Sequence, residues 1–181
     1  MKIWMKRLLF GSLFVLLFVN IVHAADFRNL NWGMSMMEVK NSEIAKLLDE
    51  SDSSLSYQDI IAEMDCTIEY KFYKEQLIDA TYLFENPHID RNFYIRDFKK
   101  LKDILTQKYG NSNKQTNKVN VGEGDLVINL NYISDWSTPE TEIQLFLLGD
   151  NAKISLKIYY SSVEINKLRE VESEQNLLEN F

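Results

Sequence analysis

Few side chains in this sequence are suited to nucleophilic or acid–base chemistry. The chain has a single cysteine, Cys66, and one histidine, His88, that lies far from the N-terminus. A nucleophilic mechanism needs a thiolate or alkoxide, a base and a group that orients the base, and this pair supplies two of the three. Acidic residues follow His88 at Asp90 and Asp97. An enzyme that uses acids together with His88 is one hypothesis, and the alternative is that His88 helps to fix a turn.

Metal and cofactor chemistry has less support. The sequence contains no C-x-x-C or H-x-x-x-H pair of zinc ligands, and the polar stretches at 49–54 and 149–151 lack the EF-hand spacing. It also contains no glycine-rich phosphate loop and no G-x-S-x-G elbow. We therefore expect both polar stretches to be turns, and we expect no metal, no cofactor and no catalytic constellation.

Exposed aromatic side chains are better candidates for a binding role. Tyrosine and tryptophan anchor many protein interfaces, and this chain has nine tyrosines and three tryptophans. We expect the tryptophans outside the N-terminal segment to pack against the core and three of the tyrosines to remain exposed. The candidate contacts to a ligand or partner are these three tyrosines with the histidine and its acid, namely Tyr73, Tyr109, Tyr132, His88 and Asp97.

The first 24 residues have the features of a secretory signal peptide. Three basic residues precede an apolar run over 8–22, and the small residues that follow fit cleavage after Ala24. As a helix, a run of 15 residues spans about 22 Å, which is short of a membrane core of roughly 30 Å. We expect residues 1–24 to be removed and the protein to be exported, to the periplasm in preference to the medium.

The remaining 157 residues carry 17 basic and 27 acidic side chains, which is a net charge of −10. This acidity argues against unaided binding to nucleic acid or anionic lipid, because such partners need a basic surface. The length suits one domain of ordinary size and excludes a large multidomain enzyme. No later segment is long and apolar enough to span a membrane. The lone Cys66 has no disulfide partner, so we expect it to be buried in a strand.

Local patterns predict the elements of the N-terminal half. Ser35 and Glu38 have the spacing of a capping box, so a helix is expected from Met36 to the polar cluster that begins at Asp49. Alternating apolar residues then predict strands, and the last two of these form a hairpin. The expected strands cover 55–62, 65–73 and 76–85.

The C-terminal half repeats this order. Asp90 or Asn92 can cap a second helix that ends at Gly110, and the polar residues 111–124 are expected to form a mobile loop. Three further strands are expected over 125–133, 140–148 and 152–160. Ser161 and Glu164 repeat the capping-box spacing and predict a third helix, which begins at Val163 and frays near Asn176.

This order predicts an α+β fold. Two units, each a helix followed by an antiparallel meander, would form a sheet with helices packed on one face and a C-terminal helix at the end. We expect a single domain over 25–181. Its two halves, 25–86 and 87–162, resemble each other in the order of their elements, and the sequence leaves open whether they arose by duplication.

The sequence has three distinctive stretches, namely Trp32-Gly33-Met34-Ser35, Asp65-Cys66 with Ile68, Tyr70 and Phe72, and Gly149-Asp150-Asn151 with Tyr159 to Ser162. Together they resemble a family of small exported bacterial proteins of unknown function, and this resemblance covers nearly the whole mature chain. It implies no activity, cofactor or catalytic residue. The order of elements is also similar in outline to the β-lactamase-inhibitor-protein fold and to the small lipoprotein of the outer-membrane β-barrel assembly machinery, both of which bind proteins.

The sequence therefore predicts an exported, soluble and non-enzymatic module that binds another envelope protein or a small ligand. The sheet backed by helices would present its other face, or its loops, to this partner. Two alternatives stay open. One is an enzyme of an unrecognised class that uses acidic residues and His88, and the other is a purely structural component of the envelope.

Overall fold

The computed structural model describes residues 25–85, 87–121, 128–150 and 153–179, so the signal peptide predicted at 1–24 lies outside the described residues. Eight strands and three helices form within them. In chain order they are α1 (Met36–Ser42), β1 (Lys46–Glu50), β2 (Ser54–Ile61), β3 (Met64–Tyr73), β4 (Gln76–Phe84), α2 (Arg91–Tyr109), β5 (Lys114–Val121), β6 (Ile128–Ser137), β7 (Thr141–Gly149), β8 (Ile154–Ser162) and α3 (Val163–Glu179).

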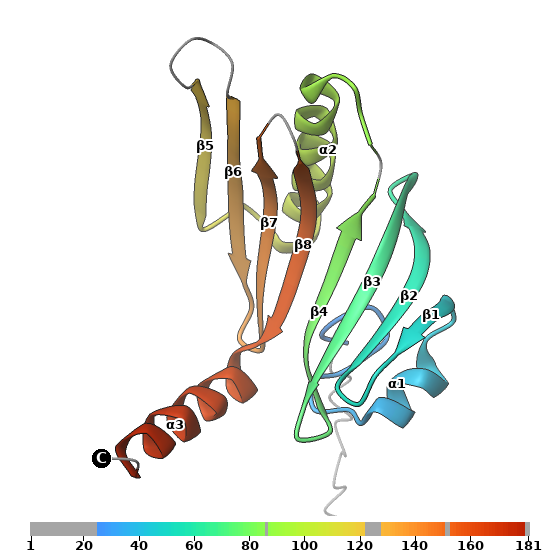
Figure 1. Cartoon of the computed structure of the whole chain (residues 1–181), viewed down its shortest axis with the longest axis vertical. Helices are drawn as coiled ribbons and strands as arrows, with labels where there is room; N and C mark the ends of the chain where they lie inside the picture. The colour runs from blue at the N-terminus through green and yellow to red at the C-terminus, as the bar shows by residue number, and fades with distance from the viewer. Residues whose placement is uncertain (1–24, 86, 122–127, 151–152, 180–181) are drawn as a thin grey trace, which may run out of the picture.

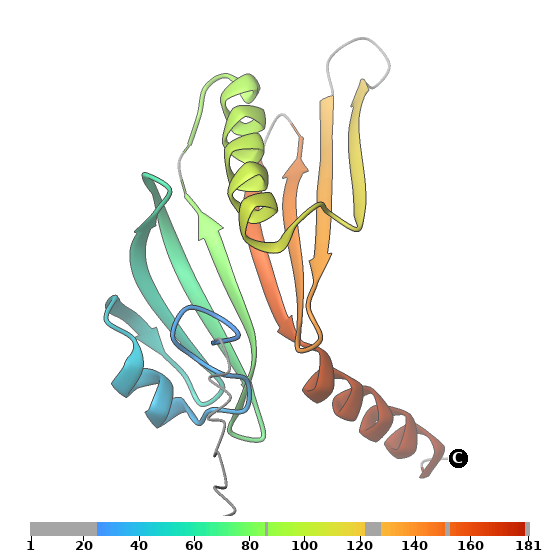
Figure 2. The ribbon, with the colours of Figure 1, turned by 180° about the vertical axis from the view of Figure 1, so that it is seen from behind.

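All eight strands belong to one antiparallel sheet, in the order β1-β2-β3-β4-β8-β7-β6-β5. Two four-stranded meanders, β1 to β4 and β5 to β8, join where β4 pairs with β8 (Figure 1). The N-terminal segment, α1 and α2 lie on one face of this sheet, as the view from behind shows (Figure 2). The predicted α+β class, with helices packed against an antiparallel sheet and a last helix at the C-terminus, is confirmed.

One hydrophobic core lies between the sheet and these helices, and it includes side chains from both meanders. At the β4–β8 boundary Phe27 packs against three tyrosines, with ring centroids 5.7 Å from Tyr70, 5.1 Å from Tyr82 and 4.8 Å from Tyr160. The aromatic cluster formed by these four residues joins the N-terminal segment to strands of both halves. Cys66 is buried on the same side, as expected from the alternation of its strand.

Helix α2 closely follows its prediction. The carboxylate of Asp90 accepts the backbone N–H of Asn92 at 2.8 Å, and the helix ends at Gly110, whose φ of 83° favours glycine. Its inward face buries Phe98, Leu101 and Leu105 against β6 and β7. The helix thus covers the second meander, and α1 with the N-terminal segment covers the first (Figure 2).

The predicted length of the first helix is wrong. The capping box of Ser35 and Glu38 forms, but α1 ends at Ser42 and the next residues form the edge strand β1. Glu43 ends the helix because its carboxylate accepts the backbone N–H groups of Ile44 and Ala45. The same carboxylate is bound by Arg28, so a contact distant in sequence overrides the local helical pattern.

The mobile loop predicted over 111–124 is also wrong for the residues that the structure describes. Lys114–Val121 forms β5, which pairs with β6 from Lys114 opposite Asp135 to Val121 opposite Ile128. Because β5 is an edge strand, it needs little of the hydrophobic alternation that marks an inner strand, and its lysines are typical of protected sheet edges.

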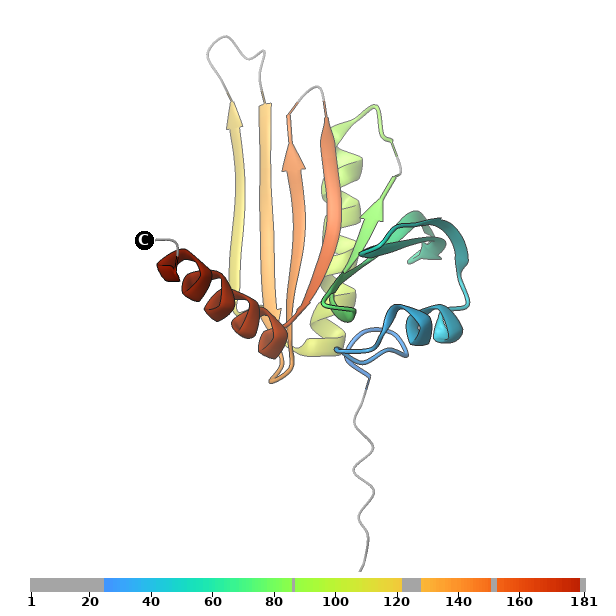
Figure 3. The same cartoon turned by 60° about the horizontal axis from the view of Figure 1, so that its bottom comes forward.

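Helix α3 begins at Val163 as predicted, but its cap differs from the expected one. The hydroxyl of Ser162, in place of that of Ser161, accepts the backbone N–H of Ile165 at 3.2 Å. From there α3 leaves the end of β8 and points away from the sheet (Figures 1 and 3). None of the helices in the described part of the chain is long and apolar enough to cross a membrane.

Candidate functional site

His88 and Asp97, two of the predicted contact residues, lie side by side. The Nε2 atom of His88 is 2.6 Å from Oδ2 of Asp97, and the two side chains are 20% and 10% exposed. The backbone N–H of His88 also donates to the hydroxyl of Tyr94 at 2.9 Å. His88 stands in the connection from β4 to α2, and Asp97 faces back from the second turn of that helix.

This arrangement meets one geometric requirement of acid–base catalysis, because a carboxylate can orient the imidazole of His88. It also meets a structural need, since a carboxylate at a buried helical position is costly without a partner. Around the pair lie Phe93, whose ring centroid is 5.6 Å from that of His88, and Arg96, whose Nε is 3.6 Å from Asp97. Cys66 lies elsewhere, in the core on β3.

The three predicted tyrosines are half-buried rather than exposed. Tyr132 packs edge-on against Phe98 of α2 at 5.5 Å between ring centroids, and Tyr109 packs against the core at the end of the same helix. Tyr73 stands at the other end of the molecule, where its hydroxyl donates to Glu172 of α3 at 2.8 Å. The structure thus places the five candidate residues in separate regions, apart from His88 with Asp97.

A partly buried ionic cluster had no signal in the sequence. The guanidinium of Arg28 contacts Glu43 at 3.2 Å and Asp59 at 2.7 Å, and the hydroxyl of Tyr70 donates to Glu43. Burial, with the hydrogen bond to Glu43 as a second cause, raises the pKa of Tyr70 above its usual range. The unusual feature of Arg28 is its backbone, which has a left-handed φ of 55°. This conformation cannot be recognised from the sequence. The side chain of Glu43 is 2% exposed, so this cluster is suited to holding the fold together.

The thiol of Cys66 is poorly suited to nucleophilic chemistry. Burial, followed by the charge of Asp59, raises its pKa to about 11. Because the thiolate is the reactive form, a pKa this high leaves the thiol inert near neutral pH. Among the described residues, no three acidic, histidine or cysteine side chains gather as metal ligands do.

The face of the sheet opposite α1 and α2, here called the open face, offers a more extensive surface. Its side chains alternate along each strand with those of the core, and no described helix lies over its middle (Figure 1). One cross-strand rung joins Ile133 of β6, Phe146 of β7, Lys157 of β8 and Leu83 of β4. The ammonium of Lys157 lies 5.3 Å from the centre of the Phe146 ring.

The apolar members of this rung are half-buried in the free protein. We call Leu83, Ile133 and Phe146 the apolar row. Polar side chains border it on the neighbouring rung, where Tyr159 donates to the buried carboxylate of Asp79 at 2.6 Å. An apolar centre with a polar border is typical of a surface that receives another molecule.

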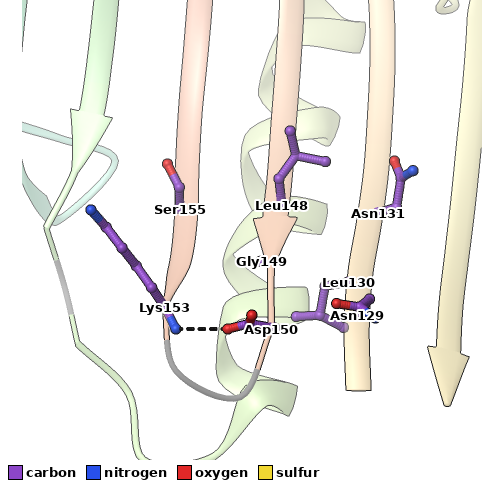
Figure 4. Close-up of a pocket in the computed structure, with 8 residues that line it drawn as sticks. All are labelled: Asn129, Leu130, Asn131, Leu148, Gly149, Asp150, Lys153 and Ser155. Atoms are coloured by element: carbon purple, nitrogen blue, oxygen red, sulfur yellow. Dashed lines mark hydrogen bonds between the residues drawn. The ribbon is translucent and has the colours of Figure 1, made fainter. Parts of the chain in front are cut away.

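A shallow hollow of about 470 Å³ lies at one end of the open face, beside the turn from β7 to β8. Figure 4 shows Asn131, Leu148 and Ser155 on the side of the sheet away from α2. The amide oxygen of Asn131 is buried, and no described group donates a hydrogen bond to it. At the turn, the backbone N–H of Lys153 donates to the carboxylate of Asp150 at 3.1 Å, which closes the end of the hollow.

Comparisons with protein families, with characterised proteins and with solved structures find no match to this chain. The resemblance to small exported proteins and the outline similarity to the β-lactamase-inhibitor-protein fold therefore stay predictions. The open face and the His88–Asp97 pair are the two candidate sites of this protein.

Proposed function

We propose that this protein is an exported, non-enzymatic binding module whose open face receives another envelope protein or a small ligand. The observation that carries the proposal is the apolar row of Leu83, Ile133 and Phe146 on a sheet face that no described helix covers. Burying such a row against a partner removes apolar surface from water, at about 25 cal/mol per Å².

The chemistry of the rest of the molecule supports this proposal. The thiol of Cys66 has a high pKa, and the charged cluster of Arg28, Glu43 and Asp59 is engaged within itself. By contrast, the open face combines apolar side chains with hydrogen-bonding groups such as those of Asn131 and Ser155. A protein partner would use the apolar row, whereas a small polar ligand would use the hollow beside Asn131.

The test compares variants in binding assays with extracts of the native envelope. Phe146→Ser and Leu83→Ser should abolish the recovery of a specific partner, while Ile44→Ser, a change at a side chain that is 90% exposed elsewhere, should leave it intact. Equal recovery by all variants would contradict the proposal. A thermal-shift screen with envelope saccharides and peptides tests the hollow in the same way, with Asn131→Ala as the variant.

Export is tested separately, by the mass of the protein purified from its native cells. Cleavage after Ala24 predicts a chain that begins at Ala25. A chain that keeps residues 1–24 and stays in the cytoplasm would contradict this part of the proposal.

The His88–Asp97 pair favours a second candidate, an enzyme of an unrecognised class. Its imidazole is oriented by a carboxylate 2.6 Å away and is partly accessible. The test is turnover of a panel of hydrolysable metabolites by the wild type and by His88→Ala and Asp97→Asn. Activity that both variants lose with an unchanged melting temperature would support catalysis, and the absence of turnover by the wild type would favour the binding module.

A further inference from the structure

Helix α3 leaves the end of β8 and points away from the sheet (Figures 1 and 2), and it packs little against the rest of the molecule. The hydroxyl of Ser162 caps it, and Glu172 accepts hydrogen bonds from Tyr73 at 2.8 Å and from Lys74 at 2.6 Å. These bonds place the side of the helix that carries Glu172 against the turn between β3 and β4. A 17-residue helix is close to the limit at which isolated helices are stable in water, so it needs further packing.

The helix surface next to Glu172 carries apolar side chains without a cover, since Leu168 lies one turn before Glu172 and Val171 directly precedes it. Leu168 is 57% exposed and Val171, almost one turn later, is 51% exposed. With Pro139 and Val163 they line an open groove of about 320 Å³. Soluble helices usually bury such a stripe against a neighbouring element, and no described element lies against this one.

The charges beside this stripe indicate what covers it. If Leu168 and Val171 occupy the a and d positions of a heptad, Lys167 and Glu174 both fall at g positions. Two such helices that pack antiparallel bring g positions together, so Lys167 of each copy lies opposite Glu174 of the other. One complementary pair is thereby formed twice by two-fold symmetry.

A parallel arrangement fits less well. It would place Glu164, at a d position, against Glu164 of the second copy, and like charges at such a position repel. In the antiparallel arrangement Glu164 instead faces Gln175, which is neutral. The pattern is therefore complementary to itself in one orientation only.

We propose that α3 pairs antiparallel with α3 of a second copy of this chain, through Leu168 and Val171 at the centre and Lys167 with Glu174 at the border. Two helical turns bury less than the roughly 800 Å² per partner of a standard interface, so the dimer is reversible and depends on concentration. This inference does not depend on the open face and stands whether or not the proposed binding function is correct.

The test is the mass of the purified protein in solution, measured by sedimentation over a range of concentrations. The wild type should form a reversible dimer, and Leu168→Glu combined with Val171→Glu should be monomeric throughout. Ile44→Glu combined with Ile60→Glu, which adds the same two charges at side chains that are 90% and 64% exposed outside α3, should dimerise like the wild type. A wild type that stays monomeric, or a dimer that survives the Leu168 and Val171 changes, would overturn the proposal.

A charge exchange distinguishes the antiparallel pairing from a non-specific apolar contact. Lys167→Glu should raise the dissociation constant about tenfold, because two attractive pairs become repulsive. Adding Glu174→Lys to that variant should restore the constant to near its wild-type value. Circular dichroism confirms that each variant keeps its fold, and a double variant as weak as Lys167→Glu alone would refute the antiparallel register.

Discussion

The side chains best suited to nucleophilic or acid–base chemistry are held within the fold of this protein. Cys66 is buried in the core, Asp97 is paired with His88, and Glu43 is held by Arg28 and Tyr70. The contacts of Asp97 and Glu43 satisfy carboxylates that would be costly to bury alone. At the scale of single residues, the structure therefore predicts that changes at these positions alter stability.

The thiol of Cys66 should be inert in the folded protein. Burial raises its pKa to about 11, so near pH 8 only a minute fraction is thiolate. A thiol reagent at this pH should label the native protein slowly, at a rate limited by unfolding, and should label it at once in denaturant. Rapid labelling of the native protein would show that Cys66 is accessible and would reopen the question of a reactive thiol.

His88→Ala should destabilise the fold, because it leaves the carboxylate of Asp97 buried without its partner. Removal of a hydrogen bond to a charged group costs about 1.5–3 kcal/mol. Asp97→Asn keeps an acceptor for the imidazole and should cost about 1 kcal/mol. Urea unfolding followed by tryptophan fluorescence measures both values. A cost near zero for His88→Ala would mean that the pair contributes little to the architecture.

At the scale of elements, the aromatic cluster around Phe27 connects the two meanders. Tyr82 belongs to β4 and Tyr160 to β8, the two strands at which the halves of the sheet join. Burial raises the pKa of Tyr82 to about 12 and that of Tyr160 above its usual range. Ionising either tyrosine in the folded protein is therefore disfavoured.

This cluster predicts how the protein unfolds in alkali. Unfolded tyrosine loses its proton near pH 10, whereas the folded groups hold theirs to higher pH. The free energy of unfolding should accordingly be insensitive to these groups below about pH 10 and should fall as the pH rises above it. Tyrosinate absorbance and circular dichroism should change together. Gradual ionisation of all tyrosines with an unchanged dichroism spectrum would contradict the burial of the cluster.

The elements that the sequence predicted well are those whose signals are local. The cap of Asp90, the helical spacing of Phe98, Leu101 and Leu105, and the end at Gly110 all lie within α2, and that helix forms as expected. The strands β1 and β5 escaped prediction because edge strands carry little alternation, and because Glu43 ends α1 through a contact with the distant Arg28.

The candidate site was predictable only in part. His88 and Asp97 were singled out by residue type, and their contact follows from the turn that leads His88 back onto α2. The apolar row had no such signal, because Leu83, Ile133 and Phe146 become neighbours only through the pairing order of four strands. Which face of a sheet stays uncovered is likewise decided by tertiary packing.

At the scale of the whole molecule, charge is unevenly distributed. Residues 91–118, which include α2 and most of β5, carry eight basic and two acidic side chains. The rest of 25–181 carries nine basic and 25 acidic ones. A hydrogen bond of 2.5 Å from Lys102 to Gln115 links α2 to β5, and α2 packs on β6 and β7, so these basic residues belong to the half of the sheet formed by β5 to β8. Acidic side chains dominate the rest of residues 25–181.

This asymmetry predicts that the chain over residues 25–181 binds a cation-exchange resin at low salt despite its net charge of −10. Salt should release it, since the screening length falls to about 8 Å at physiological ionic strength. Changing Lys99, Lys108 and Lys118 to Glu should abolish retention. The matched control changes Lys46, Lys71 and Lys153 to Glu, which gives the same net charge and should leave retention nearly unchanged. Equal loss in both variants would show that only the total charge matters.

We propose that the open face is the working surface of this protein. The most direct measurement replaces Phe146 by a photo-crosslinking amino acid in the cells that make the protein, with the same replacement at Ile44 as the control. We predict a discrete adduct from position 146 that is absent from position 44 and disappears when Leu83 is changed to Ser. No adduct at position 146, or the same adducts from both positions, would contradict the account.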